Sequence, residues 1–115
     1  DMIWPNCIEA QLMHTKAGMV VLIGEGAGIT IRDEVHLIES EENRYAVIEK
    51  FLDSKENTPG EWNEYDITVQ DGTLELKVNG YIQNVGSDLT KTKGHIAIQS
   101  EGSPMQFRNI RLVTL

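Results

Sequence analysis

The chain of 115 residues has little of several features that would each point to a class of protein. Cys7 is its single cysteine, so no internal disulfide can form and the chain is not a disulfide scaffold. No apolar run approaches the roughly 18 residues of a membrane span, and no signal peptide is visible. Basic residues are scarce, with 10 Lys and Arg against 18 Asp and Glu. The net charge of -8 argues against nucleic acid or an anionic membrane as a partner, because both demand a basic surface.

What remains is the composition of one ordinary globular domain, 40% hydrophobic and 24% charged. Its length allows a two-layer core but is short for a complete large sandwich. The acidity suits a neutral or cationic small ligand, although it is also a common means of keeping a protein in solution. The sequence opens at Asp1, almost directly with a predicted strand. We therefore expect a processed piece from which an export signal could have been removed.

The clearest structural pattern is a pair of hairpin turns, at Asp71-Gly72 and Asn79-Gly80, between alternating runs. Such dipeptides between alternating runs are the strongest short-range signal for β-hairpins. One face of these runs carries apolar side chains and the other is polar, as an antiparallel sheet with one wet face requires. The predicted inward residues are Tyr65, Ile67, Val69, Leu74, Leu76 and Val78.

Shorter upstream runs have the spacing of all-β folds. We expect strands at 7–13, 19–23, 28–32, 35–39 and 45–51, and a loop at 53–60. The continuous apolar run at 19–23 predicts a strand covered on both faces. Residues 39–51 also suit a helix, but their β-prone residues favour a strand. The glycines of GEGAG (24–28) could suggest a phosphate-binding loop, but a strand rather than a helix follows them and Glu25 would repel phosphate. We therefore interpret this segment as a flexible hairpin connection.

After the hairpins, GHIAIQSEG predicts a strand and a turn, and MQFRNIRL predicts the closing strand. Phe107, Ile110 and Leu112 are the expected inward residues of that strand. The step from 107 to 110 breaks the period of two, and a β-bulge at Arg108-Asn109 would restore it.

Several segments taken together resemble the 3-keto-disaccharide hydrolase domain family, and the similarity covers nearly the whole chain. The WNEY, NG and FRNIRL elements are fairly specific in this order, whereas any one alone would be weak. The segments are WPNCIEAQLM, GEWNEYDITV, LKVNG, GHIAIQSEG and MQFRNIRL.

The resemblance implies a concanavalin A-like lectin/glucanase sandwich, an antiparallel all-β jelly roll with sugar chemistry on its concave face. The chain is similar to the later part of that domain, and nothing before Trp4 matches the family's early strands. We therefore expect residues 1–115 to form one β-sandwich domain that is the C-terminal portion of a larger family domain. Without its N-terminal strands such a sandwich has open edges, which an upstream segment or another chain would complete. The family also implies a periplasmic or secreted location.

Glu9 and Gln11 lie two residues apart on one face of a predicted strand, roughly 7 Å apart. A carboxylate beside an amide suits acid–base chemistry and hydrogen bonding to a sugar. The family's corresponding strand carries Glu-x-Gln, so the resemblance implies that both line the site. Many relatives have an acidic residue next, where this chain has Met13-His14, and His14 is a possible substitute. The alternative is the solvated face of an edge strand.

Gln99 and Glu101 resemble the family's motif after the penultimate strand and are placed to reach across to Glu9. A second carboxylate opposite the first is what acid–base sugar chemistry would use, although a solvated turn is the alternative. Arg108 would orient a keto or hydroxyl oxygen, or pair with a surface carboxylate. Trp4 is a candidate for stacking on a sugar, whereas packing is the favoured role of Trp62.

Glu64-x-Asp66-x-x-x-Gln70 superficially resembles the catalytic strand of retaining glucanases, which needs a second carboxylate about 5–5.5 Å from the first. Here the last member is Gln70, and the alternation already explains these residues as an outward face. The three histidines show no ligand spacing, so we expect no metal and no cofactor. A metal held by Glu9, His14 and Glu101 is the alternative.

The leading functional hypothesis is a hydrolase or lyase that cleaves 3-keto-glycosides, with Glu9 and Glu101 as the catalytic carboxylates and a small carbohydrate as ligand. The ketone at C3 acidifies the proton at C2, so a positioned carboxylate can remove it and start an elimination. A non-catalytic carbohydrate-binding module on the same sandwich is the alternative, and a structural or interaction domain is a third, since fold does not fix function.

Overall fold

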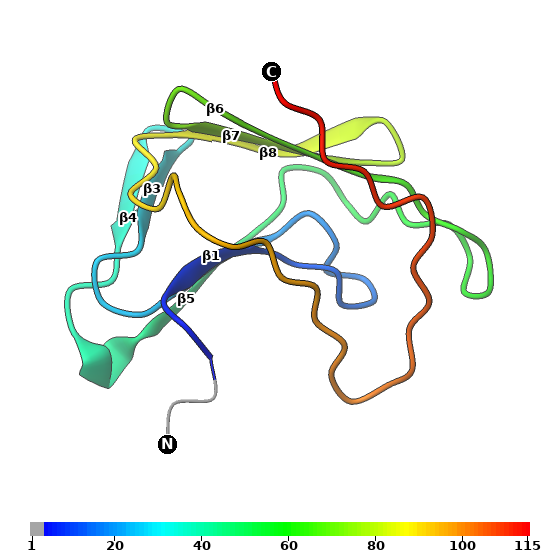
Figure 1. The fold of residues 1–115 in the computed structure, drawn as a ribbon, viewed down its shortest axis with the longest axis horizontal. Helices are drawn as coiled ribbons and strands as arrows, with labels where there is room; N and C mark the ends of the chain where they lie inside the picture. The colour runs from blue at the N-terminus through cyan, green and yellow to red at the C-terminus, as the bar shows by residue number, and fades with distance from the viewer. Residues whose placement is uncertain (1–3) are drawn as a thin grey trace.

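The computed structural model describes residues 4–115 as two antiparallel β-sheets packed face to face (Figure 1). The smaller sheet has the strand order β1-β2-β5 and the larger one β4-β3-β8-β7-β6. The expected antiparallel all-β sandwich is confirmed. The strands are β1 (Cys7–Ala10), β2 (Val20–Ile23), β3 (Gly28–Ile31), β4 (Glu34–Leu37), β5 (Tyr45–Ile48), β6 (Tyr65–Gln70), β7 (Thr73–Val78) and β8 (Tyr81–Ser87).

β2 is the central strand of the smaller sheet, and all four of its residues are buried, as the continuous apolar run predicts. Its inward residues Val20 and Leu22 join Ile29 and Ile31 of β3 and Leu76 of β7 in the core between the sheets. Full burial of a branched or aliphatic side chain contributes about 1.5–3 kcal/mol. These residues therefore supply much of the force that holds the two sheets together.

Both predicted hairpins form. Asp71 and Gly72 connect β6 to β7 with φ values of 50° and 73°, and Asn79 and Gly80 connect β7 to β8 with 52° and 83°. Two successive residues with positive φ match the twist of antiparallel strands, which is why Asp-Gly and Asn-Gly occupy these turns. The register places the predicted inward residues of the two strands opposite one another, pairing Tyr65 with Val78, Ile67 with Leu76 and Val69 with Leu74.

β8 contains a bulge, because Asn84 pairs with Leu76 while Ile82 pairs with the next residue of β7. Gln83 is the extra residue, and both Gln83 and Asn84 are buried. The Gln83 side-chain oxygen accepts a hydrogen bond from the Leu52 amide (2.8 Å), and its nitrogen donates to the Asp53 carbonyl (3.1 Å). The bulge thus binds the chain that leaves β5 to the larger sheet.

The Asn84 amide connects the same bulge to the smaller sheet. Its nitrogen donates to the carbonyls of Gly18 (2.7 Å) and Glu49 (3.2 Å), and its oxygen accepts from Arg32 Nη1 (2.9 Å). A buried amide whose donors and acceptor are all satisfied stabilises this arrangement, whereas an unsatisfied one would cost about 1–3 kcal/mol.

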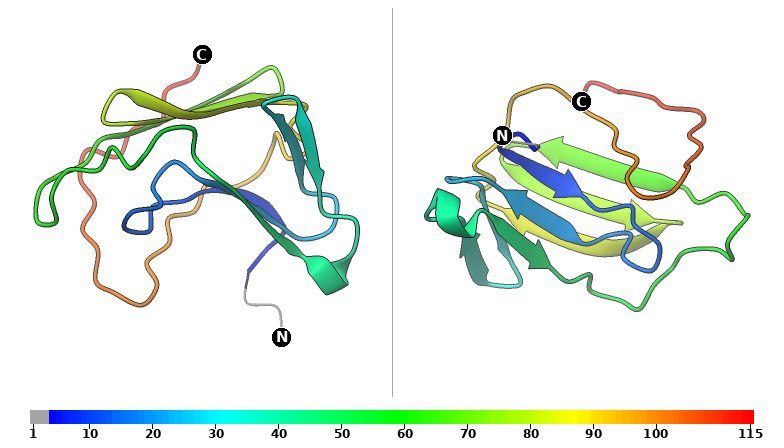
Figure 2. Two further views of the ribbon diagram at one scale, coloured as in Figure 1. Left: turned by 180° about the vertical axis from the view of Figure 1, so that it is seen from behind. Right: turned by 90° about the horizontal axis from the view of Figure 1, so that it is seen from below.

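Of two further local predictions, one is confirmed and the other is wrong. Residues 39–51 form β5 preceded by a short 3₁₀ turn, η1 (Glu41–Asn43), so the strand interpretation holds and the helix does not form. The GEGAG segment is not a hairpin connection, because β2 and β3 belong to different sheets. Its turn carries the chain from one layer of the sandwich to the other (Figure 2).

The expected strands of the last 25 residues are absent, since the structure contains no strand in residues 91–115. We call these residues the C-terminal segment. It begins on the side of β3 and β4 and then runs around the opposite side of the sandwich (Figures 1 and 2). Phe107, Ile110 and Leu112, expected to face inward, are 40%, 66% and 81% exposed. Asn109 has a φ of 54°, so the backbone does break at the position of the expected bulge, but no neighbouring strand is paired with it.

Candidate functional site

Glu9 occupies the face of β1 that points away from the core. Its neighbours Ile8 and Ala10 pack against the core cluster, and the alternation of a strand turns Glu9 to the other side. Glu9 pairs across the ladder with Val21 of β2 and is half-buried. Because it lies beside the apolar strand β2, the Glu9 carboxylate is less hydrated than a carboxylate on the open surface.

The pKa of Glu9 is raised, first by burial of its carboxyl group and second by the negative charge of Glu101. Both causes disfavour the charged form of the carboxylate. The second cause also shows that Glu9 and Glu101 lie close enough for their charges to interact, although 91 residues separate them in the sequence. The structure therefore places within electrostatic reach of each other the two carboxylates that we predicted to be catalytic.

Glu101 is held by its near neighbour, since the Gln99 side-chain nitrogen donates to Glu101 Oε2 at 3.0 Å. Ser100 Oγ donates to the Ser103 carbonyl at 2.9 Å, which closes the turn that carries the two residues. Gln99 is part-buried and Glu101 is exposed. This short turn of the C-terminal segment thus presents a carboxylate that is oriented by an amide.

Gln11 follows directly after β1, but its side-chain oxygen turns back to its own chain. It accepts hydrogen bonds from the amides of Leu12 (3.1 Å) and Met13 (3.2 Å). The Gln11 backbone continues the ladder, because its amide donates to the Met19 carbonyl at 3.0 Å. The Gln11 oxygen therefore stabilises the turn after Glu9, and a sugar-binding role for Gln11 stays a prediction.

Tyr65 supports the same turn from the larger sheet, a role that the sequence reasoning missed. Its hydroxyl donates to the Gln11 carbonyl and accepts from the Gly18 amide, both at 3.1 Å. Burial is the main cause that raises the pKa of Tyr65 to about 12, and the charge of Glu9 adds to it. The alternation of β6 predicts an inward Tyr65, but a phenol that joins two sheets has no local sequence signal.

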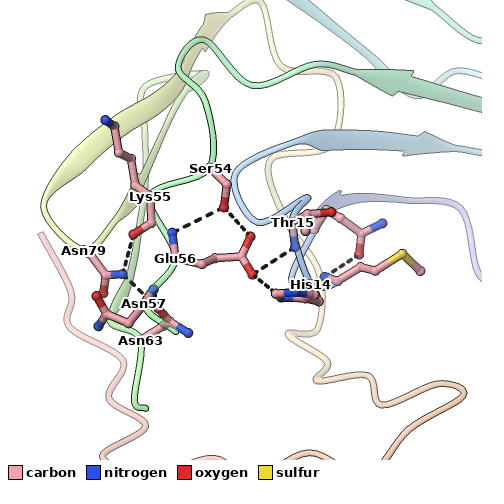
Figure 3. A network of polar contacts seen from close by, with 10 residues as sticks. His14, Thr15, Ser54, Lys55, Glu56, Asn57, Asn63 and Asn79 are labelled. Atoms are coloured by element: carbon pink, nitrogen blue, oxygen red, sulfur yellow. Dashed lines mark hydrogen bonds and ion pairs between the residues drawn. The ribbon is translucent and has the colours of Figure 1, made fainter. Parts of the chain in front are cut away.

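His14 does not join the two carboxylates, because its Nδ1 lies 3.3 Å from Oε1 of Glu56 (Figure 3). The same Glu56 oxygen accepts from the Thr15 amide at 3.0 Å, and Oε2 accepts from Ser54 Oγ at 2.9 Å. Figure 3 shows this carboxylate between the turn after β1 and the loop that follows β5. Glu56, which the sequence reasoning did not single out, thus fastens these two loops together.

A second group of side chains stabilises the same loop (Figure 3). Asn79 Nδ2 donates to the Lys55 carbonyl at 2.7 Å and to Asn63 Oδ1 at 2.9 Å. Asn63 Oδ1 also accepts from the Asn57 amide at 2.7 Å. The loop at 53–60 is therefore present as expected and is tied to the β7–β8 turn by the part-buried Asn79 side chain.

Arg108 and Trp4 also make contacts other than those expected of a sugar site. The Arg108 guanidinium lies 4.0 Å from the centre of the Trp62 ring, which is a cation–π contact. The Trp4 carbonyl accepts a hydrogen bond from Arg44 Nη2 at 3.0 Å, and the Trp4 side chain is part-exposed. The contacts of Arg108 and Trp4 thus connect them to other parts of the surface, and a sugar-binding role for either stays a prediction.

The glucanase-like pattern on β6 is an exposed face, since Glu64, Asp66 and Gln70 are all exposed. Within residues 4–115, no group of three or more His, Cys, Asp and Glu side chains is placed to hold a metal ion. The same residues include no helix that is both long and apolar enough to cross a membrane.

These observations define an all-β sandwich with two interacting carboxylates, one from β1 and one from the C-terminal segment. The family model of the 3-keto-alpha-glucoside-1,2-lyase-like domain matches residues 2–113, and the chain belongs to this family. The resemblance found in the sequence is thereby confirmed over nearly its whole length. No curated protein and no solved structure matches the chain.

Proposed function

We propose that this domain cleaves 3-keto-glucosides by elimination, with Glu9 as the base that removes the C2 proton. The observation that carries the proposal is the half-buried Glu9 carboxyl, whose pKa is raised by burial and by the charge of Glu101. A carboxylate with a raised pKa is a stronger base than a solvated one. The family to which the chain belongs is named for a lyase that acts on such glucosides.

The chemistry follows from the ketone. The carbonyl at C3 makes the C2 proton acidic, and Glu9 takes that proton as the C2–H bond breaks. The electron pair then forms the C1=C2 double bond, and the C1–O bond breaks with its electrons leaving on the aglycone oxygen. Glu101 is the group we assign to pass a proton to that oxygen, taking it from protonated Glu9 or from solvent, with Gln99 orienting its carboxyl group. Addition of water across the new double bond would turn the elimination into a net hydrolysis.

Replacement of Glu9 tests the assignment. Glu9→Gln keeps the size and hydrogen-bonding shape of the side chain but removes the base, so we expect the turnover of an α-linked 3-keto-glucoside to fall by about 10²–10⁴. Proton NMR follows both the loss of substrate and the exchange of its C2 proton with deuterated solvent. Asp66→Asn is the matched control, since it neutralises an exposed carboxylate on β6, and it should keep full activity.

The unoxidised glucoside should not react, because without the C3 ketone its C2 proton is not acidic. Full activity of Glu9→Gln would remove Glu9 as the base. Saturation transfer to both sugars without turnover of either would instead favour a carbohydrate-binding module. A periplasmic or secreted location, implied by the family resemblance, stays a prediction.

A further inference from the structure

The C-terminal segment has the pattern of a strand but not its hydrogen bonds. Residues 105–112, which we call the C-terminal run, carry four large apolar side chains and all are exposed. Within residues 4–115, no backbone hydrogen bond joins the C-terminal run to another part of the chain. The apolar side chains of the run are Met105, Phe107, Ile110 and Leu112.

The larger sheet ends at an edge that lacks a neighbour. β6 is the last strand in its order, so one side of its backbone is unpaired within the described residues. Ile67 and Val69 face the core side, opposite the buried Leu76 and Leu74, yet they remain 51% and 47% exposed. An edge of this kind is a template for one more strand.

The charges of the edge and the run are opposite. Residues 61–71, which contain β6, carry four acidic side chains and no Lys or Arg, whereas the C-terminal run carries Arg108 and Arg111 and no acid. The same asymmetry extends over the chain, since residues 91–115 have four Lys and Arg against one acid and residues 1–90 have six against 17. A basic run and an acidic edge attract one another and steer association.

We propose that two copies of this chain exchange their C-terminal runs, so that the run of each copy pairs with the β6 edge of the other. Within one copy, Arg108 rests on Trp62 and the run stays unpaired with β6. Reciprocal exchange covers both edges at once and gives a closed, twofold-symmetric dimer. The exchange covers Ile67 and Val69 of one copy with the apolar side chains of the other. It does not depend on the proposed catalytic role of Glu9.

The test is the molar mass in solution, measured by light scattering on a size-exclusion column over a range of concentrations. We expect twice the 12.9 kDa of one chain at high concentration, with backbone amides of 105–112 protected from hydrogen exchange. Reversing the charges of the run (Arg108→Glu with Arg111→Glu) should raise the dimer dissociation constant by roughly tenfold or more. This variant keeps every apolar side chain. Lys91→Glu with Lys93→Glu is the control, because it makes the same change of charge outside the run and should have a much smaller effect.

A monomer at every concentration would overturn the proposal. If its 105–112 amides exchange freely, the run has no partner strand, and if they are protected, the run pairs with β6 of its own chain. A dimer that dissociates equally in both charge-reversed variants would also overturn it, because the run would then not lie at the interface.

Discussion

The sandwich and the C-terminal segment both contain strand-like patterns of apolar and polar residues, but only the sandwich forms paired strands. In residues 65–78, alternating apolar and polar side chains form a hairpin in which every strand position of β6 has a partner in β7. In residues 105–112 a similar alternation, broken between 107 and 110, leaves the backbone unpaired and its apolar side chains exposed. Alternation of apolar and polar residues therefore predicts which face of a strand is buried. It does not predict whether the strand forms, because that requires a neighbouring strand with which the backbone can hydrogen-bond.

The two regions nevertheless meet at the candidate site. Glu9 belongs to the paired sandwich and Glu101 to the unpaired segment, and the charge of the second raises the pKa of the first. The site thus combines one carboxylate on a paired strand with one on a segment that contains no strand. The position of Glu101 thus depends on how the C-terminal segment is held.

Truncating one leucine in each region should give the largest contrast. Leu22 is fully buried, and Leu22→Ala should lower the free energy of unfolding by about 2–5 kcal/mol through lost packing and a residual cavity. Leu115 is 74% exposed, and Leu115→Ala should change the free energy of unfolding by no more than about 0.5 kcal/mol. Urea denaturation followed by circular dichroism measures both. Equal losses in the two variants would mean that the C-terminal segment is as firmly packed as the sandwich.

A pair of glycines gives a smaller contrast. A Cβ at Gly18, whose φ is 102°, would lie 2.5 Å from Gln83 Cβ, so Gly18→Ala should cost about 2–4 kcal/mol through strain and overpacking. Gly102 has a φ of 79° with no atom within 4 Å of an added Cβ, so Gly102→Ala should cost only the backbone strain of about 1–2 kcal/mol. Thermal unfolding of both variants makes the comparison. A Gly18→Ala variant as stable as the parent would contradict the close contact between β8 and the turn before β2.

The sequence predicted well where local chemistry decides the structure. Asp71-Gly72 and Asn79-Gly80 are suited to turns with two positive φ values, and the continuous apolar run of β2 indicated burial on both faces. The antiparallel sandwich follows from these features. The C-terminal strands could not be judged in the same way, because the pattern around Phe107 contains no information on whether a partner strand lies beside it.

The candidate site was also predictable only in part. The spacing and the family resemblance singled out Glu9 and Glu101, and the structure places them within electrostatic reach. The contact of His14 with Glu56 joins residues 42 positions apart, and the Tyr65 phenol joins the two sheets through hydrogen bonds alone. Such contacts depend on how distant loops meet, which no local pattern records.

The most direct test of this account is an NMR titration of the Glu9 carboxyl group in the unmodified chain and in Glu101→Gln. We expect the pKa of Glu9 to lie above its ordinary value and to fall toward it when Glu101 loses its charge, since burial would then be the remaining cause. Asp66→Asn should leave the pKa of Glu9 unchanged. An ordinary pKa that does not respond to Glu101→Gln would show that the sandwich and the C-terminal segment do not meet at a common site.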